Sequence, residues 1–462
     1  MMATGREVAA VVRRLFSGLT TAATFGNPLA SLLIVAGLLI AGCGSPAAKP
    51  SRSDGPAPKP AGPASSASLP RVMLGIDVLE ADGFRAVAGK RIGLLTHVAG
   101  VNRRGESTIE VLQRAPQTKL VALFSVEHGL YGKLPASTSY KNGKDARSGL
   151  PIYSLYTGRP EGHKPTPAML KGLDALVIDL QDIGVRSYTF TSAMLCAMAG
   201  CFEAGVEVIV LDRPNPLGGL KVDGPPLDAD LRSYVGAFRV PYVHGLTIGE
   251  LARLAKGSPN AMVIPKVINV PDRVRQSGRL TVIPMRGWDR GMQWPDTGLK
   301  WVTTSGLIDD YDAIVGYAMV GLGTEGTNWS TGVGRMFPFR ALIYPKKTPD
   351  QIIAELSRYK IPGLAFRRVQ NAVYVHVVDW SAWRPTELSF YLHKIAAGWS
   401  RGNPFRSLDA GESRTFDIHV GTKAWLDTLQ RDGAKVNVDA FVKTWSDQAA
   451  AFQQQSRKFW LY

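Results

Sequence analysis

Cysteine is scarce in this chain of 462 residues, where only Cys43, Cys196 and Cys201 occur. Cys196 and Cys201 are five positions apart in an apparently helical stretch, so they point to different sides of the helix. A disulfide between them would require the helix to break. We therefore interpret both as small buried hydrophobic residues.

Several motifs of metal and nucleotide chemistry are also missing. No His-x-x-x-His or His-Glu-x-x-His spacing occurs, which argues against a catalytic metal. No Gly-x-Gly-x-x-Gly follows the first predicted strand, so dinucleotide binding is not expected. A glycine-rich stretch at 320–334 lacks the Gly-Lys-Ser/Thr of a P-loop, and is either a binding loop or a set of turns. The sequence predicts no metal and no cofactor.

Charge is unbalanced, with a formal net charge of +16 at neutral pH. The basic residues are scattered, and no arginine-rich helix or stripe of basic and aromatic residues occurs, so we do not expect a nucleic-acid partner. A basic protein outside the cytoplasm is attracted to anionic polymers such as peptidoglycan, teichoic acids or lipopolysaccharide.

The N-terminus supports export. Three arginines precede an apolar run at 29–42, which is too short for a comfortable membrane span and ends directly before Cys43. The sequence Ile40-Ala41-Gly42-Cys43 resembles the bacterial lipobox, which implies cleavage before Cys43 and lipidation of its thiol. We interpret 1–42 as a lipoprotein signal peptide. The alternative is an ordinary secretory signal with an unrelated cysteine.

The segment that follows, 43–70, is rich in Pro, Ala, Ser and Gly and lacks aromatic residues. Such a segment cannot bury a core and favours extended conformations, so we expect a tether. Two or three acyl chains at Cys43 would hold the protein on a membrane. The expected location is the cell envelope, as a membrane-anchored lipoprotein on the periplasmic or extracytoplasmic face.

The remainder is long enough for two domains, which we place at 71–300 and 301–462. Strand and helix signals alternate in the first, with strands at 89–97, 119–125, 175–180 and 206–212. Capping-box patterns at Ser107 with Glu110 and at Thr247 with Glu250 begin two helices. The alternation of continuous apolar strands with helices predicts an α/β fold with a doubly wound, mostly parallel sheet. The second part predicts a smaller α/β or α+β domain.

Three apolar runs, 122–129, 175–188 and 208–216, stop at clusters of charged residues. In a parallel α/β sheet the carboxyl ends of the strands open onto the ligand crevice. We therefore expect the charged residues of these runs to converge on one site: Glu127, His128, Asp179, Asp182, Arg186, Asp212 and Arg213.

Seven stretches carry a family resemblance: GKRIGLLTHVAGVNRRG, LVALFSVEHGLYG, GLPIYSLYTG, KPTPAMLKGLDALVIDLQDIGVRSYTF, VLDRPNPLGG, YVHGLTIGELA and EGTNWSTGVGR. They resemble the exo-β-N-acetylmuramidase family of NamZ- or YbbC-like proteins, glycoside hydrolase family 171. The resemblance runs from about Gly75 to the closing FWLY. It implies a Rossmann-like catalytic domain, a smaller C-terminal domain, and release of N-acetylmuramic acid from the non-reducing end of peptidoglycan fragments.

The resemblance weakens after residue 300. The family has a Ser-Pro-Asn-Met-Pro-like run at the position where this chain has TTSGLIDDY. The family's Gly-Arg-Gly-Thr pattern is replaced here by Gly332-Val333-Gly334-Arg335. These departures affect the sugar subsite, the accepted aglycone, or activity altogether.

Glycoside hydrolysis needs an acid that protonates the leaving oxygen. Glu127 is our candidate, because it ends an apolar strand beside a glycine turn, where partial desolvation would raise its pKa. The resemblance points to the same Glu-His-Gly motif. The alternative for Glu127 is a surface salt bridge.

A second group must stabilise or attack the sugar centre, and the sequence offers Asp179, Asp182 and Asp212. We expect Asp182 to be the more exposed of the strand-end pair, whereas Asp179 is equally consistent with a structural role. Participation by the substrate's own acetamido group is a further route. A separation of about 5 Å between the two carboxyl groups suits a mechanism that retains the anomeric configuration, and a separation of roughly 6.5 to 9.5 Å suits a mechanism that inverts it.

The lactyl carboxylate of N-acetylmuramic acid suits a planar guanidinium. Arg186 and Arg213 are the candidates, unless they form structural ion pairs with Asp182 or Asp212. His128 and His244 would bind the sugar or adjust Glu127. Further candidates for binding hydroxyl groups are Asn215, Glu250, Glu325 and Asn328.

A different class of protein also fits these observations. A non-catalytic envelope lipoprotein that binds muropeptides or sugars would use the arginines and aromatics without needing an acid at Glu127. Turnover by the purified protein separates the two classes.

Overall fold

The computed structural model describes residues 71–324, 327–333 and 336–462. The signal peptide, Cys43 and the tether predicted above lie outside the described residues. Within the described ranges, no helix has both the length and the apolar character needed to cross a membrane.

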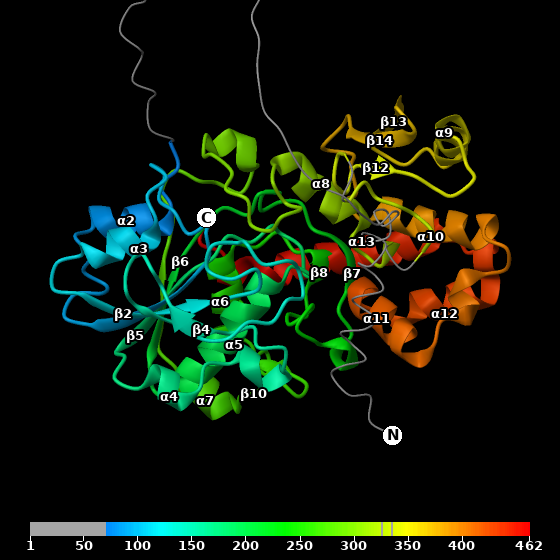
Figure 1. The fold of residues 1–462 in the computed structure, drawn as a ribbon. Coiled ribbons are helices and arrows are strands. Elements are labelled where there is room, and N and C mark those ends of the chain that lie inside the picture. The colour runs from blue at the N-terminus through cyan, green and yellow to red at the C-terminus, as the bar shows by residue number, and fades with distance from the viewer. Residues whose placement is uncertain (1–70, 325–326, 334–335) are drawn as a thin grey trace, which may run out of the picture.

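A seven-stranded sheet forms the centre of the N-terminal half (Figure 1), in the order β11-β6-β5-β1-β2-β4-β3. Six strands are parallel: β1 (Arg91–Thr96), β2 (Lys119–Ser125), β4 (Pro151–Ser154), β5 (Ala175–Asp179), β6 (Glu207–Leu211) and β11 (Leu280–Ile283). The edge strand β3 (Gly143–Lys144) is antiparallel to β4. The chain winds outward from β1 in both directions, so the predicted doubly wound sheet is confirmed, with its switch point between β1 and β5.

Both faces of this sheet are buried, which explains the continuous apolar strands. Along β5, Ala175 and Val177 belong to one core cluster, whereas Leu176 and Ile178 belong to the other. Neighbouring residues of a strand point to opposite faces, so a strand covered on both sides must be apolar at every position.

Helices of the N-terminal half cover the two faces. They are α2 (Gly75–Ala81), α3 (Thr108–Gln113), α4 (Pro167–Leu170), α5 (Thr189–Glu203), α6 (Ile248–Gly257) and α7 (Asp272–Ser277). Helix α5 is buried from Phe190 to Phe202. Its Cys196 and Cys201 are buried free thiols, as interpreted from the sequence.

One predicted capping box is confirmed and the other is wrong. Thr247 and Glu250 form the reciprocal pair at the start of α6. At α3 the Ser107 side chain instead accepts from the Ile109 N–H, while Glu110 pairs with Arg147. The capping box requires the Glu110 carboxylate, but the fold brings Arg147 close and the carboxylate binds this arginine instead.

The C-terminal half is an α+β arrangement, which decides between the two predicted classes. An antiparallel sheet β12-β14-β13 lies beside a group of helices. The elements are α8 (Tyr311–Val320), β12 (Ala341–Leu342), α9 (Pro349–Arg358), β13 (Leu364–Val369), β14 (Ala372–Val377), α10 (Glu387–Trp399), α11 (Ala410–Val420), α12 (Lys423–Asp432) and α13 (Val438–Ser456).

Smaller elements complete the described chain. Two-stranded pairs are formed by β7 (Asp223–Pro226) with β8 (Pro241–Val243), and by β9 (Val263–Ile264) with β10 (Ile268–Asn269). The 3-10 helices are η2 (Pro160–His163), η3 (Ala229–Leu231), η4 (Trp294–Thr297), η6 (Pro404–Ser407), η7 (Gly433–Lys435) and η8 (Arg457–Phe459).

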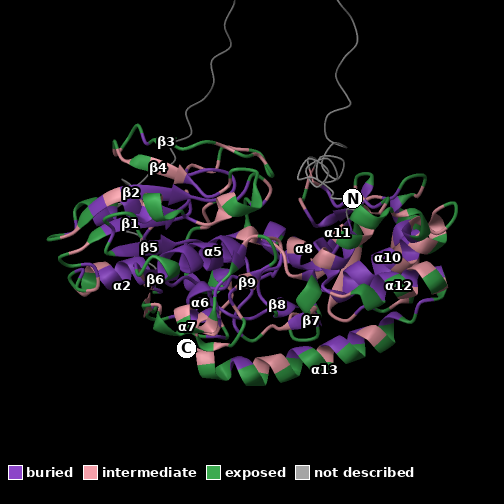
Figure 2. Ribbon diagram, turned by 90° about the horizontal axis from the view of Figure 1, so that it is seen from below, coloured by how far each residue is buried: buried purple, intermediate pink, exposed green. Residues whose placement is uncertain are grey.

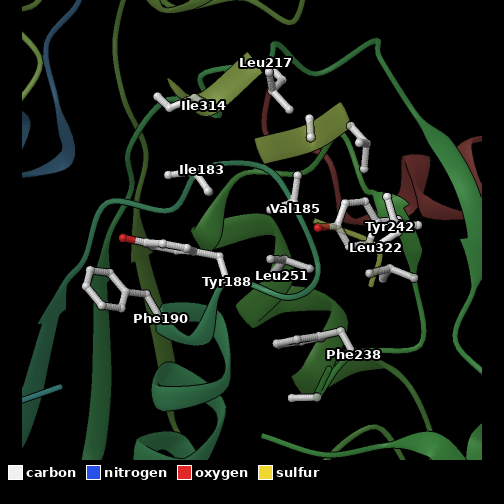
Figure 3. Packing of buried hydrophobic residues seen from close by; sticks show 14 of the residues in the cluster. Ile183, Val185, Tyr188, Phe190, Leu217, Phe238, Tyr242, Leu251, Ile314 and Leu322 are labelled. Atoms are coloured by element: carbon white, nitrogen blue, oxygen red, sulfur yellow. The ribbon is translucent and has the colours of Figure 1, made fainter. Parts of the chain in front are cut away.

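The two halves share one core. A single cluster of buried residues extends from Leu95 in β1 to Trp445 in α13. Figure 3 shows Tyr188 and Phe190, at the start of α5, in the same cluster as Ile314 and Leu322 of the C-terminal half. Helix α13 runs back beneath β7 and β8 toward α6 (Figure 2), so the end of the chain lies against the N-terminal half.

Candidate active site

Glu127 lies two residues beyond the end of β2, in a turn rather than in the strand. Its residue is 8% exposed, so the expected partial desolvation is present. Oε1 accepts from the Ser137 N–H at 2.7 Å and from the Tyr156 hydroxyl at 3.1 Å, and Oε2 accepts from the Thr189 hydroxyl at 2.9 Å. Three donors from three different segments therefore hold this carboxylate in one orientation, and the surface salt-bridge alternative is wrong.

Tyr156, which follows β4, belongs to a partly buried aromatic group beside Glu127. His163 stacks on Tyr234 with ring centroids 3.7 Å apart, and both rings contact Tyr156. Burial raises the pKa of the Tyr156 phenol, and the Glu127 charge raises it further. The phenol thus stays protonated and remains a hydrogen-bond donor to Glu127.

His128 lies in the same turn, with a left-handed φ of 70°. Its Nδ1 is 2.9 Å from the Leu134 carbonyl oxygen, a contact in which only an Nδ1–H can donate. This bond closes the loop 128–134, and no hydrogen bond of Nε2 is found within the described ranges.

His97, at the end of β1, is an unpredicted member of the site. It is 2% exposed, its ring packs on Phe190 at 4.9 Å, and its Nδ1 accepts from the Ala99 N–H at 3.2 Å. Burial, with a smaller contribution from His128, lowers the pKa of His97 to about 3. The ring is therefore neutral, with its proton on Nε2.

Asp182 follows β5 and is 3% exposed, whereas Asp179 is 0% exposed, so Asp182 is the more exposed of the pair as expected, although both residues are buried. The loop after β5 is covered by the segments 214–217 and 242–246, to which Gln181 and Asp182 are bonded. Asp182 Oδ2 accepts from the Gly184 N–H at 2.9 Å and lies 3.3 Å from His244 Nε2. His244 Nδ1 accepts from the Leu246 N–H, which places the ring proton on the side of Asp182.

Tyr188 connects the two carboxylates. Burial raises the pKa of its phenol, and the charges of Asp182 and Glu127 raise it further, so both acidic groups lie close enough to act on it. Tyr188 also contacts Phe190, which packs on His97. We call the group formed by Glu127, His128, His97, Tyr156, Asp182, Tyr188 and His244 the strand-end cluster.

Five buried polar atoms of or beside this cluster have no hydrogen-bond partner within the described ranges: His97 Nε2, Gln181 Oε1, Asp182 Oδ1, Tyr188 Oη and His244 Nε2. Leaving a buried polar atom unpaired costs about 1 to 3 kcal/mol, and such groups concentrate at sites that receive a ligand. The strand-end cluster is therefore prepared to bind a hydroxylated or amide-bearing molecule.

Asp179 and Arg213 form a buried ion pair with each other. Arg213 donates to both oxygens of Asp179, at 2.5 and 2.9 Å, and each residue is at most 3% exposed. Thr108 donates to Asp179 as well, and Arg213 also binds the Val101 carbonyl. The ion-pair alternative for Arg213 is thus correct, but its partner is Asp179 rather than Asp182 or Asp212.

Arg186 serves neither of its predicted roles, because its guanidinium donates to backbone carbonyls. It binds Pro225 and Val240 at 2.7 and 2.9 Å, and His419 and Val420 at 3.3 and 2.8 Å. Burial lowers its pKa to about 10. The arginine joins β7 and the segment before β8 to the end of α11, across the two halves of the molecule.

Asp212, Asn215 and Glu250 also have internal roles. Asp212 accepts from the Gly249 N–H and the Thr247 hydroxyl under the start of α6. Asn215 bridges the Leu246 carbonyl and the Leu217 N–H. Glu250 caps α6 and binds Arg290 at 2.7 Å. Strand-end position alone therefore does not place these side chains in the site.

The C-terminal candidates are separate from the cluster. Asn328 is exposed and donates to Ser400 Oγ at 3.1 Å, within its own half. Glu325 lies outside the described residues. Throughout 71–324, 327–333 and 336–462, no group of three or more His, Cys, Asp or Glu side chains has an arrangement that could hold a metal ion.

His97, Tyr156 and Tyr188 could have been found from the sequence. The rule that residues at strand ends converge was applied to β2, β5 and β6, whereas His97 and Tyr156 follow β1 and β4. Tyr188 is the last residue of the second apolar run, 175–188. Its importance depends on neighbours that only the folded chain brings together.

Two family models match this chain. The model described as "Exo-beta-N-acetylmuramidase NamZ, N-terminal" matches residues 92–312, and its C-terminal counterpart matches 315–462. The peptidoglycan beta-N-acetylmuramidase NamZ of Bacillus subtilis (strain 168) is 39% identical over 302 residues, which cover 65% of this chain and 68% of the relative.

Two solved structures are similar in fold. Both are DUF1343 family proteins of Bacteroides fragilis NCTC 9343. One has a TM-score of 0.74 at 34% identity, and the other a TM-score of 0.62 at 25% identity. Each comparison covers 85% of this chain and 99% of the solved chain.

Proposed function

The chain belongs to the exo-β-N-acetylmuramidase NamZ family, and from this membership we propose that it is a glycosidase that releases terminal N-acetylmuramic acid from the non-reducing end of peptidoglycan fragments. The family models together match most of the chain. The structural observation that supports the proposal best is the Glu127 carboxylate, which three donors orient at the same edge of the sheet as a second buried carboxylate, Asp182.

Glu127 is the general acid of this proposal. Its Oε1 already accepts two hydrogen bonds, from Ser137 and Tyr156, whereas Oε2 contacts only the Thr189 hydroxyl among the described residues. A hydroxyl can turn from donor to acceptor, so a proton fits on Oε2 and not on Oε1. Oε2 therefore delivers the proton to the leaving glycosidic oxygen.

Asp182 is the second group. Asp179 is bound to Arg213 and Asp212 is bound beneath α6, so neither can reach a sugar without breaking internal bonds. Asp182 keeps Oδ1 without a partner in the described part of the chain, while Gly184 and His244 hold Oδ2. This oxygen is available to the sugar centre, or to the acetamido group if the substrate participates.

His97 and His128 are proposed to bind the sugar. The Nε2–H of His97 is a buried donor with no partner in the described ranges, and His128 has its Nε2 free for a substrate hydroxyl. Because the guanidinium groups of Arg186 and Arg213 are bound internally, recognition of the lactyl carboxylate is assigned to neither.

We also propose that the protein is exported and anchored at Cys43, with 44–70 as a tether in the cell envelope. The support is the arginine-rich start, the apolar run and the lipobox-like sequence. Incorporation of a radiolabelled fatty acid into the full chain, lost in Cys43→Ala, is the expected result. Labelling that persists in that variant would exclude this anchor.

The test of the activity is release of 4-nitrophenol from its β-N-acetylmuramic acid glycoside by the purified protein. We expect release from this compound and not from the N-acetylglucosamine glycoside. Glu127→Gln should lose turnover and keep substrate binding, whereas Glu110→Gln, an exposed carboxylate on α3, should leave turnover unchanged. Binding without turnover in the unmodified protein would instead favour a muropeptide-binding lipoprotein.

A further inference from the structure

A second cavity lies in the C-terminal half, away from the strand-end cluster. It has a volume of about 350 Å³ and is lined by residues from the end of α9, the start of α10 and one face of α13. None of its lining residues belongs to the strand-end cluster. In Figure 1 the helices α9 and α10 lie at the end of the molecule opposite β2. The cavity is large enough for an amino-acid side chain with its backbone.

Two tyrosines form one wall of this cavity. The rings of Tyr359 and Tyr391 stack with centroids 4.5 Å apart and an angle of 29°. The Lys394 ammonium already lies 5.9 Å from the Tyr359 ring centroid, and is held there by the Val436 carbonyl. Aromatic faces attract ammonium groups through the ring quadrupole, so this wall is suited to a cation.

Carboxylates also line this cavity: Glu387 is buried, whereas Asp439 and Asp447 are exposed. Glu387 is 4% exposed, and Asp439 accepts a hydrogen bond from the Tyr391 hydroxyl at 2.5 Å. Among the described residues, the cationic partner of Glu387 is Arg384, at 3.4 Å, and the Arg384 side chain is 48% exposed. A buried carboxylate with one long, solvent-screened ion pair lacks the compensation that burial of a charge requires.

The groups around Glu387 leave room for an added positive charge. Burial raises the pKa of the Glu387 carboxyl to about 7; Arg384 opposes this shift, and the charges of Asp223 and Asp439 add to it. Lys360, Lys443 and Asp447 also line the cavity, but Lys443 and Asp447 bind each other at 3.0 Å on the exposed side of α13. Near neutral pH, the site therefore takes up either a proton or a ligand cation.

From the tyrosine wall and the undercompensated carboxylate we infer that this cavity binds a primary ammonium group on a flexible chain, such as the side chain of a diamino acid in a peptide. The ammonium lies against Tyr359 and Tyr391 and donates to Glu387 and Asp439. A neutral sugar fits less well, because it would leave the Glu387 charge without compensation. The inference rests on this cavity alone and does not require glycosidase activity.

Calorimetric titration of the purified protein with Nα-acetyl-lysine amide tests the inference. This probe carries one ammonium group, which stays charged below pH 9. We expect binding about tenfold tighter at pH 8 than at pH 6, because a carboxyl group with a pKa near 7 is roughly 9% ionised at pH 6 and 91% at pH 8. The diacetylated compound, which has no charge, should not bind.

Variants separate the cavity from other acidic surfaces. Glu387→Gln should weaken binding at pH 8 at least tenfold and remove the pH dependence, and Tyr359→Ala should weaken binding with the pH dependence kept. Asp350→Asn, an exposed carboxylate on α9, should bind like the unmodified protein. Circular dichroism spectra establish that each variant is folded.

Two outcomes would overturn the inference. Equal affinity for the lysine and diacetylated compounds, or binding of N-acetylglucosamine in their place, would make this a site for neutral ligands. Absence of lysine amide binding in the millimolar range would remove the site. Neither result depends on the release of 4-nitrophenol. Failure of the proposed glycosidase activity is therefore distinguishable from failure of this inference.

Discussion

The hydroxyl of Tyr462, the last residue of the chain, donates to Asp212 Oδ2 at 2.7 Å, although 250 positions separate the two residues. The same hydroxyl accepts from the Met285 N–H, and the Leu461 N–H donates to Glu250 at the start of α6. The closing FWLY segment therefore ties α13 to the strand ends of the N-terminal half (Figure 2).

Tyr462→Phe should lower the free energy of unfolding by about 1 to 3 kcal/mol, because the buried Asp212 carboxylate loses a donor. Burial already raises the pKa of Asp212 to about 6, so a lost donor adds to the cost of keeping it charged at neutral pH. Denaturant unfolding at pH 7.5 measures the change. Tyr153→Phe is the matched control, since no hydrogen bond of the Tyr153 hydroxyl is found in the described chain. Equal losses in both variants would contradict the role of this contact.

Arg186→Lys should destabilise the protein by about 3 to 5 kcal/mol, because a lysine cannot reach four carbonyls from one position. The activity of the folded fraction should fall equally on muramyl and glucosaminyl substrates. Thermal unfolding and kcat/KM ratios provide the two measurements, with Arg401→Lys on the surface as the control. A selective loss on the muramyl substrate, without loss of stability, would restore Arg186 as a lactyl-binding residue.

Asp182→Asn should reduce kcat by at least 100-fold while the protein stays folded, because the amide can neither attack nor accept a proton at the sugar centre. KM should change little, since the amide keeps the shape of the side chain. Steady-state kinetics on the muramyl glycoside measure both parameters, and Asp309→Asn, an exposed residue, is the control. A raised KM with unchanged kcat would make Asp182 a binding residue only.

Asp417→Asn should stabilise the protein at pH 8 and have little effect at pH 4. Asp417 is 8% exposed, its Oδ1 has no partner in the described part of the chain, and burial raises its pKa to about 7. The folded state therefore binds a proton more readily than the unfolded state does, so this group's contribution to stability falls as the pH rises from about 4 to 7.

Asparagine removes this cost, and we expect a gain on the order of 2 kcal/mol at pH 8. Urea unfolding of both proteins at pH 4, 6 and 8 gives the difference as a function of pH. Asp309→Asn, an exposed residue whose charge does not act on Asp417, controls for net charge. A gain that does not depend on pH would mean that the Asp417 carboxylate is not the cause.

Local patterns were sufficient for much of the fold. The strand predicted at 119–125 has the observed bounds, because apolar continuity is a property of neighbouring residues. Helix α11 was missed, because the sequence AGESRTFDIHV has no clear apolar stripe, and it owes its place to contacts with α12 and Arg186.

The sequence by itself determined the succession of strands and helices, the doubly wound sheet, the family and the choice of Glu127. Only the tertiary structure decided which charged side chains are free. Arg186, Arg213 and Asp212 have the same sequence signature as Asp182, yet their partners lie as far as 250 positions away in the chain. The end of a strand places a side chain at the edge of the sheet. Whether that side chain is then bound internally or left free depends on partners from distant loops, because hydrogen bonds depend on spatial distance and not on position in the chain.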